Sequence, residues 1–207
     1  MTRVTLDRVR LDRVCLQGAR LTSVILTDSR LHQCDLAGLR AESSSMQRTE
    51  IVDSRLTGFS WSDGALRHVH FKSCRMQYAS FRQQRFGTAW FEDCDLRDGD
   101  FQAADLRGAI FTGCDLTHVQ FSNASLDGAS FEDCTLEMAR GVSALRGASI
   151  GVKEMLSLAP SMASALGIRV ETDQDSLVHP GPDASRPDDQ DAGHAAAADR
   201  SARRGGG

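Results

Sequence analysis

The chain has 207 residues, with 24 Lys and Arg, 28 Asp and Glu, a formal net charge of −4 and six cysteines. This length allows one or two domains, and no Cys-x-x-Cys pair is present to indicate a zinc site. The N-terminus lacks an apolar run, and charged residues recur after it. We therefore expect no signal peptide and no membrane span, and a cytoplasmic protein with reduced thiols.

A repeat of five residues extends from Leu6 to Leu136. Its central position is large and apolar in 26 of 27 consecutive repeats, with Ala41 as the exception, and a small residue often lies two positions earlier. A period of five matches neither the period of about 3.6 of an α-helix nor the period of about 2 of a strand. The chain must turn a corner between inward positions, which is typical of a solenoid.

A longer period of twenty is superimposed on the five. Phe centres recur every ten residues from Phe71 to Phe131, and five of the six cysteines are multiples of twenty apart. Four repeats per coil, one for each face, explain both spacings. The sequence therefore predicts an all-β solenoid, a right-handed quadrilateral β-helix, with Cys15 pointing outward. The remaining cysteines are predicted to be inward and unbonded: Cys34, Cys74, Cys94, Cys114 and Cys134.

The repeats up to about Leu36 are regular and basic, and the pattern is least regular between Leu39 and Gln84. Leu39 is oversized for a small interior position, and we expect it to fill the space that Ala41 leaves. Gln84 also occupies a small apolar position. Because a buried amide needs hydrogen-bond partners, we expect a local bulge or a surface turn there.

After Leu136 the register shifts by one residue, and 143–150 are predicted to form a last, partial coil. Two short helices are predicted to follow, with Pro160 in the first turn of the second and Gly167 as its C-cap. A terminal strand is predicted at 168–170. The helical segment would cover the unpaired edge of the last coil.

The predicted organisation is a β-helix over 1–150, a helical cap and dimerisation segment over 151–170, and a disordered tail over 171–207. The tail is rich in Asp, Ala, Gly, Pro and Ser and has no aromatic residue. The cap offers more apolar side chains than one coil end needs, and such patches usually mark interfaces. The residues expected to form a homodimer contact are Met155, Leu156, Leu158, Met162 and Leu166.

No catalytic, phosphate-binding or dinucleotide-binding motif is present, so we expect no enzyme activity, no cofactor and no metal. Charge is the informative surface feature. Residues 1–90 carry 14 Lys and Arg against 8 Asp and Glu, whereas residues 91–140 carry 3 against 11. One interpretation is a solvated end of the rod; the other is an acidic partner-binding surface. The residues expected to form that surface are Glu92, Asp93, Asp95, Asp98, Asp100, Asp105, Asp115, Glu132 and Asp133.

The repeat resembles the pentapeptide-repeat family, whose motif is Ala-(Asp/Asn)-Leu-x-x with Phe also allowed at the centre. The closest match is Ala104-Asp105-Leu106-Arg107-Gly108, and three others are Cys94-Asp95-Leu96, Cys114-Asp115-Leu116 and Cys34-Asp35-Leu36. The resemblance covers about two thirds of the chain. It implies the quadrilateral β-helix already predicted from the spacing.

Some members of the family, the MfpA and Qnr groups, are dimeric rods that imitate B-form DNA and bind type II topoisomerases, and the uninterrupted coils here look most like that type. The resemblance implies a bacterial protein that binds DNA gyrase and modulates it or its inhibition by quinolone-like drugs. The acidic segment, residues 91–140, spans about 12 Å of rod, over which duplex DNA would carry about 7 charges. Its net charge of −8 matches that density.

The alternative is a protein-interaction scaffold with an unknown partner. The basic N-terminal coils depart from a DNA-like rod and favour this alternative. We expect neither direct nucleic-acid binding nor membrane binding under either interpretation.

Overall fold

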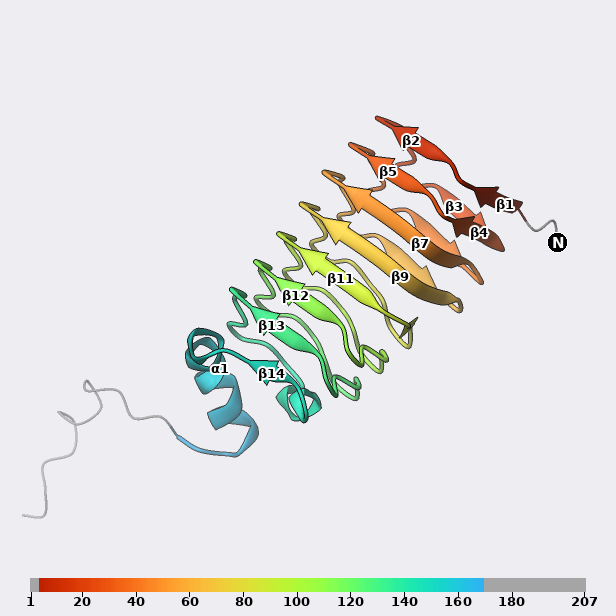
Figure 1. The fold of residues 1–207 in the computed structure, drawn as a ribbon. Coiled ribbons are helices and arrows are strands. Elements are labelled where there is room, and N and C mark those ends of the chain that lie inside the picture. The colour runs from red at the N-terminus through yellow and green to blue at the C-terminus, as the bar shows by residue number, and fades with distance from the viewer. Residues whose placement is uncertain (1–3, 170–207) are drawn as a thin grey trace, which may run out of the picture. The chain divides into compact units, whose positions relative to one another are not determined.

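The computed structural model describes residues 4–169, and over this range the chain winds into a parallel β-solenoid of about seven turns that ends in one α-helix (Figure 1). The strands are β1 (Val4–Asp7), β2 (Arg10–Asp12), β3 (Arg20–Thr22), β4 (Val24–Thr27), β5 (Arg30–His32), β6 (Arg40–Glu42), β7 (Ser45–Val52), β8 (Ser60–Ser62), β9 (Ala65–Lys72), β10 (Arg85–Phe86), β11 (Ala89–Glu92), β12 (Ile110–Thr112), β13 (Ser130–Glu132) and β14 (Ser149–Ile150). A 3₁₀ helix, η1 (Val142–Leu145), precedes β14, and α1 (Val152–Ala165) follows it. None of the helices in this range has the length and hydrophobicity needed to cross a membrane.

Neighbouring coils pair in parallel with a register of twenty residues. In the larger sheet, Leu26 pairs with Met46 and Met46 with Leu66, and strands β9, β11, β12 and β13 continue this order toward the C-terminus. Strands β3, β6 and β8 form a second, smaller sheet. The predicted four-faced coil of twenty residues is therefore confirmed.

The corners explain which residues follow each centre. At nearly every described corner the residue two positions after the centre has a positive φ, as at Asp93 (52°), Asp98 (55°) and Asp133 (53°). L-residues rarely adopt this left-handed conformation, and Gly, Asn and Asp tolerate it best. The corner position is accordingly rich in Gly, Asp and other small polar residues.

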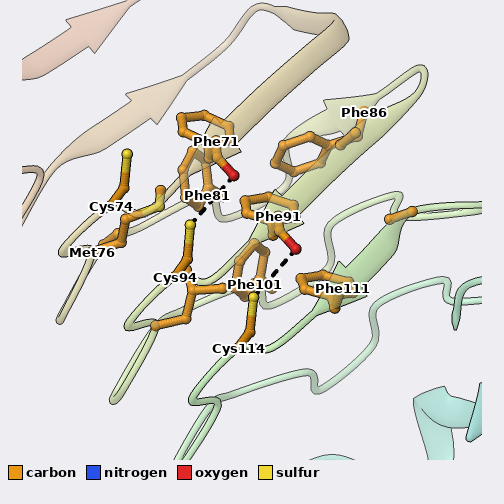
Figure 2. Packing of buried hydrophobic residues seen from close by; sticks show 14 of the residues in the cluster. Phe71, Cys74, Met76, Phe81, Phe86, Phe91, Cys94, Phe101, Phe111 and Cys114 are labelled. Atoms are coloured by element: carbon orange, nitrogen blue, oxygen red, sulfur yellow. Dashed lines mark hydrogen bonds between the residues drawn. The ribbon is translucent and has the colours of Figure 1, made fainter. Parts of the chain in front are cut away.

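The interior is a set of stacked ladders of like side chains (Figure 2). Phe71, Phe91, Phe111 and Phe131 stack with centroid separations of 5.2, 4.8 and 4.8 Å and with interplanar angles of 7° or less. A second ladder of Phe81, Phe101 and Phe121 meets the first edge to face, for example at 6.0 Å between Phe91 and Phe101. The coil spacing sets the stacking distance, because each ring can move no closer to the next than its backbone allows.

The cysteine ladder lies beside the aromatic ladders (Figure 2). Cys34, Cys74, Cys94, Cys114 and Cys134 are buried and free, whereas Cys15 is exposed, as the spacing predicts. The thiol of Cys94 donates to the carbonyl oxygen of Phe71 at 3.4 Å. Hydrogen bonds with the thiols of Cys114 and Cys74, together with burial, raise the pKa of the Cys94 thiol well above its ordinary value. Burial among these ladders makes the Cys94 side chain a packing group of the core.

The irregular region remains part of the solenoid. Leu39 and Ala41 are both buried, and Ala41 pairs in register with Trp61, whose larger ring lies one coil on. The local bulge or surface turn expected at Gln84 is wrong: Arg85 keeps its register with Ala65, and Gln84 is 1% exposed, with its Nε2 donating to the carbonyl oxygen of Gly64 at 3.0 Å. Gln84 Oε1 is the buried side-chain atom of the described residues that lacks a partner.

The C-terminal end differs from the prediction in its helices. The partial coil and the register shift are confirmed, since β14 pairs Ile150 with Phe131, nineteen residues apart. One helix replaces the two expected, and Pro160 lies inside α1. Gly167 ends the helix as expected, with φ of 70°. Ile168 completes this cap by donating its N–H to Ala163 at 2.8 Å, so it does not begin a strand. Val170 and the predicted tail lie outside the described residues.

Gly64 is the glycine at which a side chain is least tolerable. A Cβ there would lie 1.6 Å from the carbonyl oxygen of Ser44, an atom that also accepts a hydrogen bond from the Trp61 indole. We predict that Gly64→Ala lowers the free energy of unfolding by at least about 2 kcal/mol, because backbone must move. The measurement is urea denaturation followed by circular dichroism.

The matched control is Gly87→Ala, where the nearest atom to the added Cβ is the flexible Arg67 Cγ at 3.1 Å. This control should cost less than about 1 kcal/mol. Equal losses for the two variants would contradict the steric explanation.

Candidate protein-interaction surface

The solenoid distributes the predicted acidic residues over several faces. Asp95 and Asp115 form a bridge between adjacent coils on one face, whereas Asp100 lies between Ser80 and Gln120 and Asp105 between Arg85 and Ser125 on two others. Glu92 and Glu132 lie on the outer side of β11 and β13 in the same column, followed by Asp93 and Asp133 at the next corner. The nine carboxylates therefore do not form a single surface.

Four of these carboxylates help to build the turns. The side chains of Asp95, Asp100, Asp105 and Asp115 each accept a hydrogen bond from the backbone N–H two residues later. The geometry is best at Asp100, with 2.9 Å to Gln102, and at Asp115, with 3.0 Å to Thr117. This bond is the local turn that Asp and Asn favour. It gives a structural reason for the Asp that precedes the Leu or Phe centre in these repeats.

Neighbouring bases neutralise much of the segment. Arg97 lies 2.6 Å from Asp95 and 3.6 Å from Asp115, and Arg107 lies 2.7 Å from Asp105. Arg82 pairs with Asp100 at 3.3 Å. The hydrogen bond from Arg97 is the main cause that lowers the pKa of Asp95, and that from Arg107 lowers the pKa of Asp105.

Similar pairing reaches the larger sheet. Lys72 Nζ lies 2.5 Å from Glu92, and this contact lowers the pKa of the Glu92 carboxyl and raises that of the Lys72 amine. His118 lies 3.5 Å from Asp98 and Lys153 lies 3.7 Å from Asp133. Among residues 4–169, Asp93 and Glu132 are the predicted site residues without a basic group within ion-pair distance.

We call Glu92, Asp93, Glu132 and Asp133 the acidic edge. Its members share one side of the solenoid, on two coils separated by the coil that carries Thr112 and Gly113. With about 4.8 Å per coil, the two acidic pairs lie about 10 Å apart along the axis. Of the predicted acidic residues, these four are brought together by the fold and have the fewest ion pairs with neighbouring basic side chains.

The outer face of the same sheet carries two large apolar residues that sequence reasoning missed. Trp90 and Ile110 pair in register on β11 and β12, and Ile110 is 38% exposed. The signal that could have found them is the five-residue period itself. Both residues immediately precede an inward Phe, and alternate residues of a strand point to opposite sides.

Helix α1 completes the end of the core and leaves one side apolar. Met155, Leu156, Met162 and Leu166 are exposed, as a dimer contact requires, by 44%, 71%, 37% and 73%. Leu158 is fully buried, so its assignment as a dimer contact is wrong. Its side chain instead packs with the hydrophobic core of the same protomer.

Two side chains of α1 accept hydrogen bonds from backbone N–H groups of the last coil. Cys34 donates its N–H to Ser54 Oγ on the next coil, and Cys134 donates in the same way to Glu154 Oε1, both at 3.0 Å. Leu136 donates to Ser157 Oγ at 3.2 Å, whereas Leu116 donates to a carbonyl oxygen of the next coil. The buried Glu154 therefore supplies an acceptor that another coil would have provided. Within residues 4–169, no three His, Cys, Asp or Glu side chains are grouped so that they could hold a metal ion.

The parallel coils, the stacked interior and the turn-forming Asp residues define a pentapeptide-repeat β-solenoid. Residues 84–142 match the family model described as a pentapeptide repeat region. Residues 84–142 therefore contain a pentapeptide-repeat region, and residues 4–169 have the β-solenoid fold of such repeats. No curated protein matches it in sequence.

Solved structures similar to this chain include QnrB1, a plasmid-mediated fluoroquinolone resistance protein. The identity is 14%, the alignment covers 79% of this chain and 100% of QnrB1, and the TM-score is 0.34. Rfr23 from the cyanobacterium Cyanothece 51142 is 19% identical over 61% of this chain and 86% of its own, with a TM-score of 0.33. HetL from the cyanobacterium Nostoc sp. strain PCC 7120, involved in heterocyst differentiation regulation, is 18% identical over 72% and 83%, with a TM-score of 0.19. At these values the likeness carries no information about function.

The turn role of the aspartates is testable at Asp115, whose carboxylate also accepts from the Thr117 hydroxyl at 2.6 Å. We predict that Asp115→Ala lowers the free energy of unfolding by about 1 kcal/mol, since it leaves the Thr117 N–H without its acceptor. Asp115→Asn keeps the acceptor oxygen and should lose clearly less. Equal losses in urea denaturation would show that charge, and not the turn bond, is what Asp115 contributes.

Proposed function

We propose that this protein is a non-enzymatic cytoplasmic homodimer that binds a type II topoisomerase, DNA gyrase, through its acidic edge and thereby modulates the enzyme or its inhibition by quinolone-like drugs. The observation that carries the proposal is the position of Glu92, Asp93, Glu132 and Asp133 on hydrogen-bonded coils. Carboxylates on such a scaffold keep their spacing before the partner arrives. The choice of gyrase comes from the resemblance to the MfpA and Qnr groups.

The ion pairs reduce the number of carboxylates between 91 and 140 that could imitate the charge of DNA. Asp95, Asp100 and Asp105 each lie beside an arginine, so these carboxylates contribute little net potential to a distant partner. Asp93 and Glu132 remain available to a basic protein surface. Complementary potential of this kind speeds association and makes it sensitive to salt. The proposed contact is therefore a short acidic edge and not the whole segment from 91 to 140.

A gyrase supercoiling assay tests the contact. We predict that the purified protein changes supercoiling or its inhibition by a quinolone, and that converting Glu92 and Glu132 to Gln and Asp93 and Asp133 to Asn weakens the effect at least about tenfold. The control converts Asp95, Asp100, Asp105 and Asp115 to Asn, which removes the same number of charges and keeps an acceptor for each turn. This control variant should affect gyrase supercoiling, or its inhibition by a quinolone, nearly as strongly as the original protein does. The proposal fails if the neutralised edge is fully active, or if the original protein has no effect on gyrase.

The exposed face of α1 supports the homodimer. Val152, Met155, Leu156, Met162 and Leu166 are exposed apolar residues at helical spacing along α1 and its C-cap, and they continue outward from the buried Leu158. Dimerisation would cover this apolar face and bring two acidic edges into one assembly.

We predict that Leu156→Glu together with Leu166→Glu weakens dimerisation at least about tenfold, because two charges would be buried in the interface. Sedimentation equilibrium at about 10 μM measures this. Ser164→Glu, an exposed change away from the apolar face, is the control and should leave the dimer intact. If the wild-type protein is a monomer at this concentration, the homodimer proposal is wrong and α1 only covers the coil end.

The second candidate function is a scaffold for another protein partner. Trp90 and Ile110 on the outer face of the sheet favour it, because imitation of DNA requires negative charge and not an exposed indole or branched aliphatic side chain.

A further inference from the structure

We propose that the outer face of the sheet at Trp90 and Ile110 is a docking site for an arginine-bearing segment of a partner protein. The inference goes beyond the proposed function, because it names the chemistry of the contact and holds whether or not the partner is a topoisomerase.

The geometry begins with three neighbouring strands, β9, β11 and β12, that lie side by side in the larger sheet (Figure 1). His70, Trp90 and Ile110 occupy the same outward position in these strands, since Trp90 pairs with both of the others. The His70 and Trp90 rings meet edge to face with centroids 6.3 Å apart. Imidazole, indole and aliphatic side chain therefore form a continuous strip along the sheet.

The fold does not require this strip. In other coils the same outward column carries polar residues, namely Arg10, Arg30, Glu50 and Ser130. The core beneath is complete without Trp90, because Phe71, Phe91 and Phe111 stack on one another on the inner side. A partly exposed Trp with an exposed Ile is typical of the centre of a protein-protein contact, where Trp contributes more binding energy than most residues.

The charges around the strip select the partner. Glu92 projects on the same side of β11 as Trp90, and Glu132 lies two coils beyond Glu92 in the same column. Lys72 and Lys153 are the nearby lysines, and they are already held by Glu92 and Asp133. His70 also contacts Glu92, at 3.1 Å. The strip therefore has an apolar centre, and Asp93 and Glu132, which have no basic group within ion-pair distance among residues 4–169, give it an acidic border.

A guanidinium group fits this combination better than other ligands. Arginine stacks on an indole face and at the same time pairs with a carboxylate, whereas a lysine ammonium is more strongly hydrated and stacks less well. Phosphate-bearing partners, such as nucleic acid or an anionic membrane, would be repelled by Asp93 and Glu132. The complementary partner is a protein segment that presents arginine beside an apolar side chain.

The test uses two fluorescein-labelled peptides, one with four arginines and one with four lysines, and measures binding by fluorescence anisotropy at low salt. We expect the arginine peptide to bind about threefold or more tightly than the lysine peptide. Trp90→Leu should abolish this preference while leaving lysine-peptide binding unchanged, and Trp90→Phe should keep part of it. Tyr78→Leu removes another exposed aromatic residue outside the strip and serves as the control, which should keep the full preference.

Three results would overturn the proposal. They are no binding of either peptide, equal affinities for the two peptides, and an arginine preference that survives Trp90→Leu. Because no topoisomerase is present, these results are independent of the gyrase assay. Thermal unfolding of each variant should match the original, since the substituted side chains point outward.

Discussion

The backbone hydrogen bonds between parallel coils are the constraint on which the rest of this structure depends. They hold every residue above its counterpart twenty positions away, as at Leu26, Met46 and Leu66. Equivalent side chains then meet at nearly the coil spacing, which suits flat aromatic rings and small thiols. Phe91 and Phe111 stack at 4.8 Å with an interplanar angle of 4°. Stability in such an arrangement is the sum of contacts between neighbouring coils, so a local defect such as the unpaired oxygen of Gln84 is tolerated without loss of the fold.

A repeating structure of this kind must also be ended. At the C-terminal end, Glu154 and Ser157 accept the N–H groups of Cys134 and Leu136, and Leu158 closes the core. A carboxylate is usually costly in an apolar interior, and here it replaces an acceptor that the next coil would have supplied. The same helix leaves Met155, Leu156 and Met162 exposed, and these residues are the ones proposed for the homodimer contact.

Several acidic residues of the predicted binding surface also serve the fold. Asp95 and Asp115 stabilise turns, and Asp93 and Asp98 occupy corners with positive φ. A count of charges along the sequence therefore overstates the surface available to a partner. The proposed contacts rest on the carboxylates that have no basic neighbour and on the apolar strip at Trp90.

The five- and twenty-residue periods by themselves determined the four-faced coil, the inward cysteines and the register shift after Leu136, because a solenoid maps sequence spacing directly onto stacking. The family resemblance followed from the same residues. Only the tertiary structure decided the rest. Continuity of the single helix through Pro160, burial of Leu158 and the position of Gln84 depend on packing at one site, which no periodicity encodes. Pairing of Arg97 with Asp95 and Asp115 depends on side-chain conformations across neighbouring coils, so it too could be recognised only in three dimensions.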